Sequence, residues 1–261
     1  MSAVLAPSAA AVGTIGLDEL TARAALLTRV DRKYLLTTAE AEVVLAAVAA
    51  LHPLVLDIEG TREFAYESVY FDTPDLLSYR LAAHDRRRRF KLRTRGYLDT
   101  DGAYLELKTR GARRVTVKDR IPVDPADRGR ITPAGVGYVA DAFDDLGIGA
   151  STVASLRPTI TTGYRRTTML LPETAARATI DTDLAWADRD GHELVRRDLV
   201  VIETKSPPGG AGGFDRVLWR LGHRPARISK FATGLAALHP ELPANRWARV
   251  LRRHFPERRA A

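Results

Sequence analysis

The sequence predicts an α+β protein built on a closed antiparallel β-barrel, a tunnel of about eight strands, with helices packed outside the barrel and at its ends. Many segments alternate charged or hydroxyl-bearing residues with apolar ones, and successive side chains of a strand point to opposite faces. Segments with helical spacing lie near both ends of the chain and need an apolar surface to pack on. A closed barrel accounts for both the alternating strands and the helices, because the polar faces of its strands line the interior while their apolar faces pack against the helices. A length of 261 residues suits one such domain.

A basic hairpin is the clearest element of this pattern. Residues 89–95 and 104–110 alternate regularly, and a turn-forming stretch with Asp99, Asp101 and Gly102 separates them. One face of the first strand carries Arg89, Lys91, Arg93 and Arg95. One face of the second strand carries Tyr104, Glu106, Lys108 and Arg110. The opposite faces are apolar, so we expect them to be buried.

Before the hairpin, the spacing predicts helices and strands in turn. Thr37 and Thr38 are good helix caps and Glu40 follows in the first turn, which indicates a helix start. The expected elements are a short helix over 17–27, a strand over 29–36, a helix over 39–51, a strand over 64–72 and a short helix or turn over 76–84.

After the hairpin, residues 114–123 form the next predicted strand, with Lys118 and Arg120 on one side and Val117 and Ile121 on the other. Residues 124–154 are expected to be a helical insert with a helix near 138–146. The remaining predicted elements are strands over 159–171, 176–184 and 199–205, a helix over 214–221 and a helix from about 227 to 238.

The overall composition limits the classes of binding partner and of fold that this sequence can have. Lys and Arg number 40 against 32 Asp and Glu, a net charge of +8 that favours a polyanionic partner. The absence of cysteine excludes a disulfide-stapled secreted fold and thiolate metal sites. The six histidines are scattered and show no ligand pair.

No stretch is long and apolar enough to span a membrane, so we expect a soluble, cytoplasmic protein. The expected organisation is a flexible tail over 1–16, the tunnel domain over 17–240 and a basic tail over 241–261.

The predicted interior would contain many cations close together. Two unit charges ~5 Å apart at an effective dielectric constant near 20 repel by roughly 3 kcal/mol. A lining of this kind therefore requires an anion among the cations. A phosphate chain fits, because the arginine fork matches phosphate oxygens and lysine supplies a point charge.

Several short segments, taken in order, resemble one known family. They are Asp31-Arg32-Lys33-Tyr34, Ser68-Val69-Tyr70-Phe71-Asp72-Thr73, residues 89–97, Glu106-Leu107-Lys108, Tyr164-Arg165-Arg166, Ile180-Asp181-Thr182, Ile202-Glu203-Thr204-Lys205 and Ile228-Ser229-Lys230-Phe231. Together these segments resemble the VTC domain, the catalytic module of the vacuolar transporter chaperone polyphosphate polymerase, within the triphosphate tunnel metalloenzyme superfamily. The resemblance covers roughly residues 28–238.

The resemblance implies an eight-stranded tunnel that binds a nucleoside triphosphate or polyphosphate, together with Mn²⁺ or Mg²⁺. The residues that it implies in catalysis are Arg93, Arg95, Lys108, Arg166 and Lys230. The implied phosphate-binding residues, with neighbours on the same predicted faces, are Lys33, Lys91, Lys118, Arg120, Arg177, Lys205 and Arg227. Glu203 is the implied metal ligand, and Glu106 either assists the metal or pairs with a neighbouring cation. Tyr70, Tyr97 and Tyr164 are interpreted as packing residues.

Two positions depart from the family pattern. Relatives that hydrolyse triphosphates have Glu-x-Glu-x-Lys in the first strand, where this chain has Arg29-Val30-Asp31-Arg32-Lys33. The loss of an acidic residue weakens a water-activating site and favours the polymerase side of the family. The expected Lys-x-Ser-Lys at the last helix is Arg227-Ile228-Ser229-Lys230, which keeps the charge but changes the geometry.

The leading hypothesis is a metal-dependent phosphotransferase that moves the γ-phosphate of ATP to the end of a polyphosphate chain. The alternatives are a triphosphatase or nucleoside triphosphate hydrolase, and a non-catalytic module that binds polyphosphate, pyrophosphate or nucleotide. Specific nucleic-acid binding is disfavoured, because it predicts aromatic side chains interleaved with the cations. The sequence leaves open a membrane-protein partner and the oligomeric state.

Overall fold

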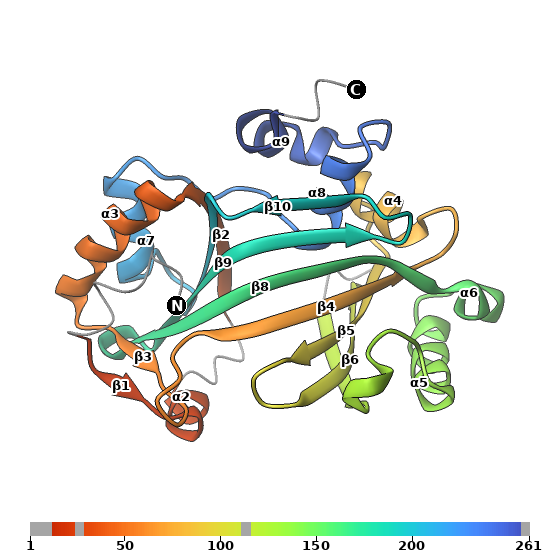
Figure 1. The fold of residues 1–261 in the computed structure, drawn as a ribbon, viewed down its shortest axis with the longest axis horizontal. Helices are drawn as coiled ribbons and strands as arrows, with labels where there is room; N and C mark the ends of the chain where they lie inside the picture. Colours follow the sequence, from red (N-terminus) through yellow and green to blue (C-terminus); the bar gives the residue numbers. More distant parts are fainter. Residues whose placement is uncertain (1–11, 24–28, 111–115, 257–261) are drawn as a thin grey trace. The chain divides into compact units, whose positions relative to one another are not determined.

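The computed structural model describes residues 12–23, 29–110 and 116–256. The fold is α+β with a large antiparallel sheet, as predicted (Figure 1). Its strand order is β2-β11-β9-β8-β4-β5-β6-β7, and the short strands β1, β3 and β10 (Glu193–Arg196) pair outside this path. The chain divides into two compact units, and β8 (Arg157–Leu171) and β9 (Ala176–Asp188) contribute residues to both.

The first unit comprises Met1–Ala65, Tyr164–Leu184 and Val195–Ile228. Its elements are β1 (Thr14–Ile15), α2 (Leu17–Arg23), β2 (Val30–Thr37), α3 (Thr38–Val48), β3 (Leu54–Leu56), β11 (Leu199–Ser206), α7 (Gly213–Arg220) and its parts of β8 and β9. Thr37 caps α3 as expected, because its hydroxyl accepts the N–H of Glu40 while the Glu40 carboxylate accepts the N–H of Thr37.

The core of this first unit forms where α3 and α7 cover the apolar faces of β2, β9 and β11. Val44 and Leu45 of α3 and Phe214 of α7 are buried in the same cluster as Ile180 and Ile202. The alternation along the strands therefore leaves Lys33, Glu203 and Lys205 on the face opposite these helices.

A buried polar network joins α7 to β2 and β11 in the first unit. Asp215 is fully buried and accepts hydrogen bonds from the hydroxyls of Tyr34 (2.7 Å) and Thr204 (2.6 Å), while Arg32 lies 3.1 Å from its other oxygen. Burial, followed by the hydrogen bond to Asp215, raises the pKa of Tyr34. Arg32 therefore belongs to this network, on the face of β2 opposite Lys33.

The second unit comprises Tyr66–Gly163, Ala185–Leu194 and Ser229–Ala261. Its elements include most of β4 (Phe64–Asp72), α4 (Leu77–Ala83), β5 (Arg89–Tyr97), β6 (Gly102–Arg110), β7 (Thr116–Pro122), α5 (Pro133–Asp144), α6 (Ala150–Ser155), α8 (Lys230–Leu238) and α9 (Ala248–His254). The predicted hairpin is β5–β6, and it alternates buried and half-buried residues along β5. Leu92, Leu105 and Phe143 pack in one core beneath α5.

One glycine, Gly234, and one tryptophan, Trp186, fix the position of α8 in the second unit. A Cβ on Gly234 would lie 2.2 Å from the ring of Trp186, so only glycine allows this approach. The indole N–H of Trp186 donates to the carbonyl of Lys230 at 2.8 Å. This contact sets the position of the first residue of α8.

Two sequence expectations need correction. The strand path has ends at β2 and β7, so hydrogen bonds among the described residues do not close the sheet into the predicted barrel. Val117, predicted to lie on a packed face of β7, is 55% exposed. The alternation defines the faces of a strand, but it does not say whether the last strand of a path is covered or paired. Among the described residues, no helix has the length and apolar character needed to cross a bilayer.

Candidate functional site

The second unit contains a cluster of cations around one carboxylate, here called the Glu106 cluster: Glu106, Arg93, Arg95, Lys118 and Tyr70. The antiparallel register aligns Tyr70, Arg93 and Glu106 across β4, β5 and β6, with Arg120 of β7 opposite Glu106. Residues aligned in this way share one face of the sheet. The local pairing of four strands therefore builds the cluster.

Glu106 is bound mainly by arginine. One of its oxygens accepts hydrogen bonds from Nη2 (2.6 Å) and Nε (2.9 Å) of Arg93, and Arg95 lies 3.5 Å away. Lys118 lies 3.2 Å from the other oxygen. Burial by itself raises the pKa of Glu106, but the charges of Arg93 and Lys118 outweigh it and hold the pKa below its usual value. Glu106 is therefore ionised and holds three cations in place.

Tyr70 shows that positive charge remains in excess here. Its hydroxyl accepts a hydrogen bond from Arg93 at 2.9 Å, and its ring stacks on Phe231 of α8 with centroids 5.0 Å apart. Burial by itself raises the pKa of Tyr70, but the charges of Arg93, Lys91 and Lys230 lower it to about 8. The sequence analysis treated Tyr70 as a packing residue. Its place on the same predicted strand face as Ser68 and Asp72 could have indicated its contact with the cations.

Buried polar atoms beside this cluster have no protein acceptor. These atoms are Nε of Arg95 and the hydroxyl of Ser68, two residues that align in register across β5 and β4. Both atoms are buried without a hydrogen-bond partner among the described residues. A buried donor without an acceptor is costly, so an anionic oxygen bound at this point would be favourable.

The other predicted cations of the second unit surround the Glu106 cluster. Lys91, Lys108 and Lys118 align across β5, β6 and β7, and Lys108 is exposed. Arg120 lies over the ring of Tyr104, 4.3 Å from its centroid. Lys230 begins α8, where the hydroxyl of Ser229 caps the helix.

The first unit contains a second cluster, here called the Glu203 cluster: Glu203, Lys33, Lys205, Arg166 and Asp181. In register, Glu203 of β11 lies between Lys33 of β2 and Thr179 of β9. Its oxygens are 3.6 Å from Nζ of Lys33 and 3.6 Å from Nζ of Lys205. The Glu203 side chain is 17% exposed, compared with 3% for Glu106. Water and a ligand can therefore reach Glu203 more readily.

Arg166 and Asp181 form a forked ion pair in this first unit. Nε and Nη2 of Arg166 donate to the two oxygens of Asp181 at 2.6 Å and 2.8 Å. Burial by itself lowers the pKa of Arg166, but the charge and hydrogen bonds of Asp181, together with Tyr164 and Glu203, outweigh burial and raise the pKa. The sequence analysis named Asp181 only as part of the family resemblance and did not predict its pairing with Arg166. Each oxygen of the Asp181 carboxylate thus accepts one hydrogen bond from Arg166.

Lys205 lies in a positive environment. Burial lowers its pKa, and the charges of Arg177 and Arg166 lower it further, while Glu203 and Asp31 act in the opposite direction. Arg177 faces Lys205 in register across β9 and β11. The cations of both clusters thus exceed the carboxylates that neutralise them.

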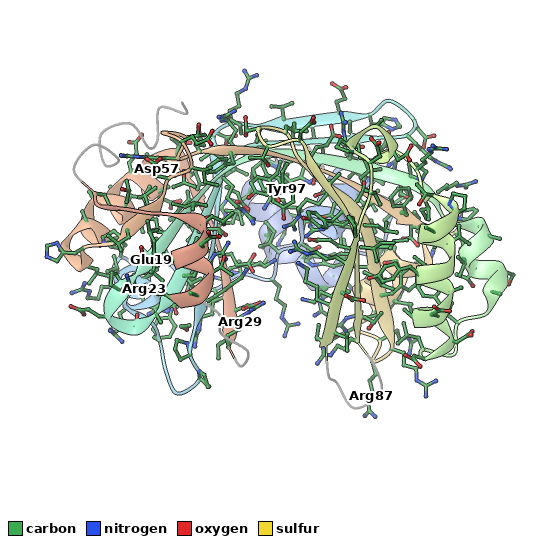
Figure 2. The ribbon with its side chains drawn as sticks, turned by 90° about the horizontal axis from the view of Figure 1, so that it is seen from below. Glu19, Arg23, Arg29, Asp57, Arg87 and Tyr97 are labelled. Atoms are coloured by element: carbon green, nitrogen blue, oxygen red, sulfur yellow. The ribbon has the colours of Figure 1, made fainter. Side chains whose placement is uncertain are left out.

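One predicted position, Arg227, lies apart from these clusters, whereas Asp31 faces Lys205 of the Glu203 cluster in register across β2 and β11. Arg227 is exposed in the segment between α7 and α8. Asp31, in the place of the acidic pair of hydrolases, forms an ion pair with Arg29 at 3.1 Å. Arg87 is an exposed arginine of the second unit and lies outside the Glu106 cluster. Both Arg29 and Arg87 are labelled in Figure 2.

A family model described as the VTC domain matches residues 28–239, which is more than half of the chain. The chain belongs to the VTC domain family. The match confirms the resemblance seen in the sequence, and membership in this family indicates an enzyme of the phosphate-transfer or triphosphatase type. No curated protein matches the sequence significantly.

Solved structures match this VTC domain at low sequence identity. A candidate adenylate cyclase from Bacillus halodurans has a TM-score of 0.48 and 15% identity, covering 77% of this chain and 94% of that one. A candidate adenylyl cyclase from Hippeastrum, described as having a dominant triphosphatase activity, has a TM-score of 0.46 and 16% identity, covering 79% and 94%. A protein from Pyrococcus horikoshii has a TM-score of 0.44 and 11% identity, covering 79% and 98%.

The carboxylates of this VTC domain differ in their fitness for Mn²⁺ or Mg²⁺. These ions prefer oxygen ligands and retain several waters or phosphate oxygens. Glu203 fits this donor chemistry because it is partly exposed and its ion pairs with Lys33 and Lys205 are longer than hydrogen bonds. Glu106 would have to release the hydrogen bonds from Arg93. Glu203 is therefore the better candidate ligand.

Histidines form a further group that the sequence analysis missed. It found no ligand pair among them, yet His192 and His239 both contact Asp188 in the second unit. A separation of 47 positions between the two histidines hides their proximity from any local pattern.

The sequence argument against nucleic acid also needs correction. Its premise, that aromatic residues are absent among the cations, is wrong, because Arg95 lies over Tyr66 and Arg120 over Tyr104. Tyr70 is nevertheless closed to a base, since Phe231 stacks on it and the residue is 2% exposed.

Proposed function

We propose that this VTC domain is a metal-dependent phosphotransferase that moves the γ-phosphate of ATP to the end of a polyphosphate chain. The observation that carries the proposal is the excess of positive charge in each cluster. Despite burial, the charges of Arg93, Lys91 and Lys230 lower the pKa of Tyr70, and burial, with the charges of Arg177 and Arg166, lowers the pKa of Lys205. Partly buried cations without equal numbers of carboxylates favour binding of an anion. Phosphate groups match both the charge and the forked donors of arginine.

In the Glu106 cluster, the proposed role of the protein is to hold arginines ready for phosphate. Glu106 fixes the guanidinium of Arg93 through two hydrogen bonds and Arg95 through an ion pair. Donors fixed in advance stabilise developing negative charge without rearrangement during the reaction. The proposed phosphate contacts here are Lys91, Arg93, Arg95, Lys108, Lys118, Arg120 and Lys230.

In the Glu203 cluster, the proposed role is to bind phosphate together with a divalent metal. Asp181 orients Arg166 with its fork, while Lys33, Arg177 and Lys205 supply further positive charge. Glu203 would hold Mn²⁺ or Mg²⁺, which neutralises charge on phosphate oxygens. Arg227 is an outlying contact in this proposal. Phosphoryl transfer depends on positioning and charge neutralisation, so no covalent nucleophile is required.

Transfer to a phosphate acceptor is favoured over hydrolysis by the surroundings of Asp31. A hydrolase needs a group that orients or deprotonates water. The first strand here has one carboxylate in place of two, and that carboxylate pairs with Arg29. Phosphate acceptors are already ionised and need no such base.

The test is to incubate the purified chain with ATP and Mn²⁺ or Mg²⁺ and to separate the products on a gel. We expect ADP and polyphosphate chains of increasing length. Arg93→Ala should lower kcat/KM by about 10²- to 10³-fold, as for loss of one charge-stabilising donor. Arg87→Ala, which removes an exposed arginine from the same unit, is the matched control and should remain within about twofold.

The other outcomes separate the alternatives. ADP and orthophosphate without chains would identify a hydrolase, and tight ATP binding without turnover under varied metals would identify a binding module. Circular dichroism of both variants distinguishes loss of activity from loss of fold. Equal activity of the two variants would remove the Glu106 cluster from the mechanism.

A further inference from the structure

Three metal-binding side chains converge in the second unit, outside both cation clusters. Asp188 ends β9, His192 follows in the turn to β10 (Glu193–Arg196), and His239 caps the C-terminus of α8. One oxygen of Asp188, Oδ2, lies 2.8 Å from Nδ1 of His192 and 2.7 Å from Nε2 of His239. The three donor atoms all lie within 4.8 Å of one another.

Additional contacts orient two of these three side chains, Asp188 and His239. The other oxygen of Asp188 accepts the backbone N–H groups of Asp190 and His192 at 2.8 Å and 2.9 Å, which leaves Oδ2 directed at the imidazoles. Nδ1 of His239 lies 3.4 Å from a carboxylate oxygen of Glu241. Metal-binding histidines commonly donate their second N–H to a carboxylate in this way, which fixes the tautomer.

We infer that Asp188, His192 and His239 form a binding site for a transition-metal ion of the Zn²⁺ type. Zn²⁺ binds histidine nitrogen and carboxylate oxygen at about 2.0–2.2 Å, which corresponds to a separation of about 3.3 Å between tetrahedral ligands. The donor pairs joined through Asp188 would therefore need to separate by only about 0.5 Å. Zn²⁺ takes the place of the two hydrogens that bridge Asp188 and the rings. Each ring proton passes through solvent to the other nitrogen of the same ring, so His239 donates from Nδ1 to Glu241 and His192 carries its proton on Nε2.

The donor set distinguishes this ion from the metal proposed at Glu203. Two imidazoles and one carboxylate suit Zn²⁺, whereas Mg²⁺ prefers oxygen ligands and water. The inference is independent of the proposed function, because none of its three residues belongs to either cation cluster. The site would join the β9–β10 turn to the C-terminus of α8, whose first residue is Lys230.

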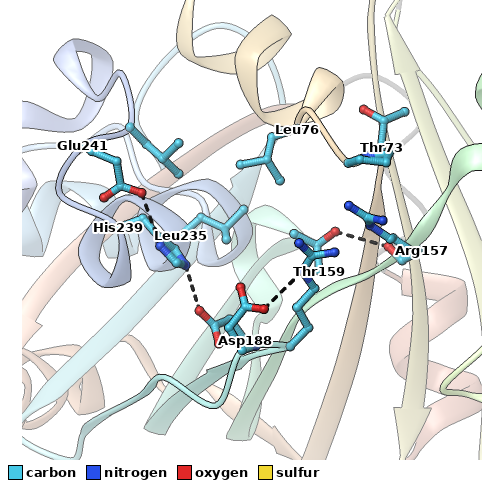
Figure 3. A pocket seen from close by; sticks show the side chains of 12 residues that line it. Thr73, Leu76, Arg157, Thr159, Asp188, Leu235, His239 and Glu241 are labelled. Atoms are coloured by element: carbon cyan, nitrogen blue, oxygen red, sulfur yellow. Dashed lines mark hydrogen bonds and ion pairs between the residues drawn. The ribbon is translucent and has the colours of Figure 1, made fainter.

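A cavity leaves one position of the ion accessible. Asp188, His239 and Glu241 line a cavity of about 250 Å³ together with Arg157, Arg189 and Thr159 (Figure 3). The Asp188 side chain is 2% exposed and that of His239 is 22% exposed, while His192 is 59% exposed. With three protein ligands, the fourth position is open to water or a small anion, which the two arginines favour.

The experiment measures Zn²⁺ bound to the full chain without an affinity tag. Protein is equilibrated with Zn²⁺, passed through a desalting column and analysed for metal content, and titration calorimetry gives the affinity. We expect one tightly bound equivalent, and a weakening of more than about 100-fold in His192→Gln and in His239→Gln. Co²⁺ should give the intense visible absorption of a tetrahedral site in the parent chain and lose it in both variants.

Matched controls separate this site from the other proposals. His223→Gln changes a histidine of the first unit and should keep the full equivalent of Zn²⁺. Glu203→Gln should also keep it, so failure of the metal site and failure of the proposed catalytic metal give different results. Equal Zn²⁺ binding by the parent chain and both histidine variants would overturn the inference, as would the absence of a bound equivalent. The three side chains would then be only a hydrogen-bonded group.

Discussion

The Glu106 and Glu203 clusters use the same residue types in different ways. Glu106 is nearly fully buried and accepts two hydrogen bonds from Arg93, with Arg95 and Lys118 also close. Glu203 is more exposed, and its ion pairs with Lys33 and Lys205 span 3.6 Å. In its cluster, the tight fork belongs instead to Arg166 and Asp181.

The comparison teaches that a carboxylate among cations can serve two purposes. A carboxylate held by hydrogen bonds from arginine orients those cations, and using it as a metal ligand would cost those contacts. A carboxylate at longer range from lysines can exchange them for a metal, because lysine side chains are flexible. We therefore propose that Glu106 orients the arginines and that Glu203 binds the metal.

The largest expected effect separates these two assignments directly. Glu203→Gln should reduce metal-dependent turnover by about 10³-fold, equivalent to about 4 kcal/mol in the activation free energy. The physical reason is loss of the anionic ligand while the cations remain. Turnover measured against Mn²⁺ concentration in the parent chain, Glu203→Gln and Glu106→Gln checks this prediction. If Glu106→Gln abolished the response to metal and Glu203→Gln preserved it, the assignments would be reversed.

The second prediction concerns stability. Glu106→Gln should lower the free energy of unfolding by about 3 kcal/mol, because it leaves partly buried arginines without their counter-charge. Added polyphosphate should stabilise this variant more than the parent chain, since its phosphates replace the missing negative charge. Thermal unfolding with and without polyphosphate measures both effects.

A matched variant keeps this second prediction specific. Asp127→Asn removes a carboxylate from the ion pair with Arg130, whose side chain is 69% exposed. This variant should lower the free energy of unfolding by less than about 1 kcal/mol, as for surface ion pairs. Polyphosphate should stabilise it no more than it stabilises the parent chain. Equal stabilisation of Glu106→Gln and the parent chain by polyphosphate would argue against phosphate binding at the Glu106 cluster.

Much of the fold follows from the sequence because each unit buries one face of its strands. The alternation in 89–95 and 104–110 predicts β5 and β6, since Leu92 and Leu105 must reach a core while the charged residues cannot. The caps likewise predict the start of α3. The helix expected near 138–146 lies within the longer α5, which Thr132 and Pro133 begin earlier. Residues 24–28 and 111–115, which include parts of the predicted helix over 17–27 and strand over 114–123, lie outside the described residues.

The parts that sequence could not predict depend on contacts distant along the chain. The buried carboxylate of Asp215 is 181 positions from Tyr34, and that of Asp188 is 51 positions from His239. Local spacing carries no information about such pairs. The sequence also could not predict that the strand path stays open. Alternation assigns a residue to a face of its strand, but it does not specify which strands pair at the ends of the sheet.

The prediction with the smallest expected effect uses the pKa of Tyr70 to measure the excess of positive charge in the Glu106 cluster. The folded-state pKa of about 8 lies below the usual tyrosine value of 10.0, so ionisation of Tyr70 stabilises the fold above pH 10. That contribution is lost as the pH falls from 10 through 8. Ultraviolet titration of tyrosinate should show one early transition in the parent chain that is absent in Tyr70→Phe.

Polyphosphate makes this titration a test of the comparison between the clusters. Phosphate bound near Arg93, Lys91 and Lys230 would neutralise the charges that lower the pKa of Tyr70. The early transition should then move upward by about 1 to 2 units, which corresponds to about 1.4 to 3 kcal/mol. Glu203→Gln, in the other cluster, should leave the position of the transition unchanged in the absence of polyphosphate. A transition near pH 8 that polyphosphate does not move would mean that phosphate binds away from Tyr70, and the Glu106 cluster would then have a structural role alone.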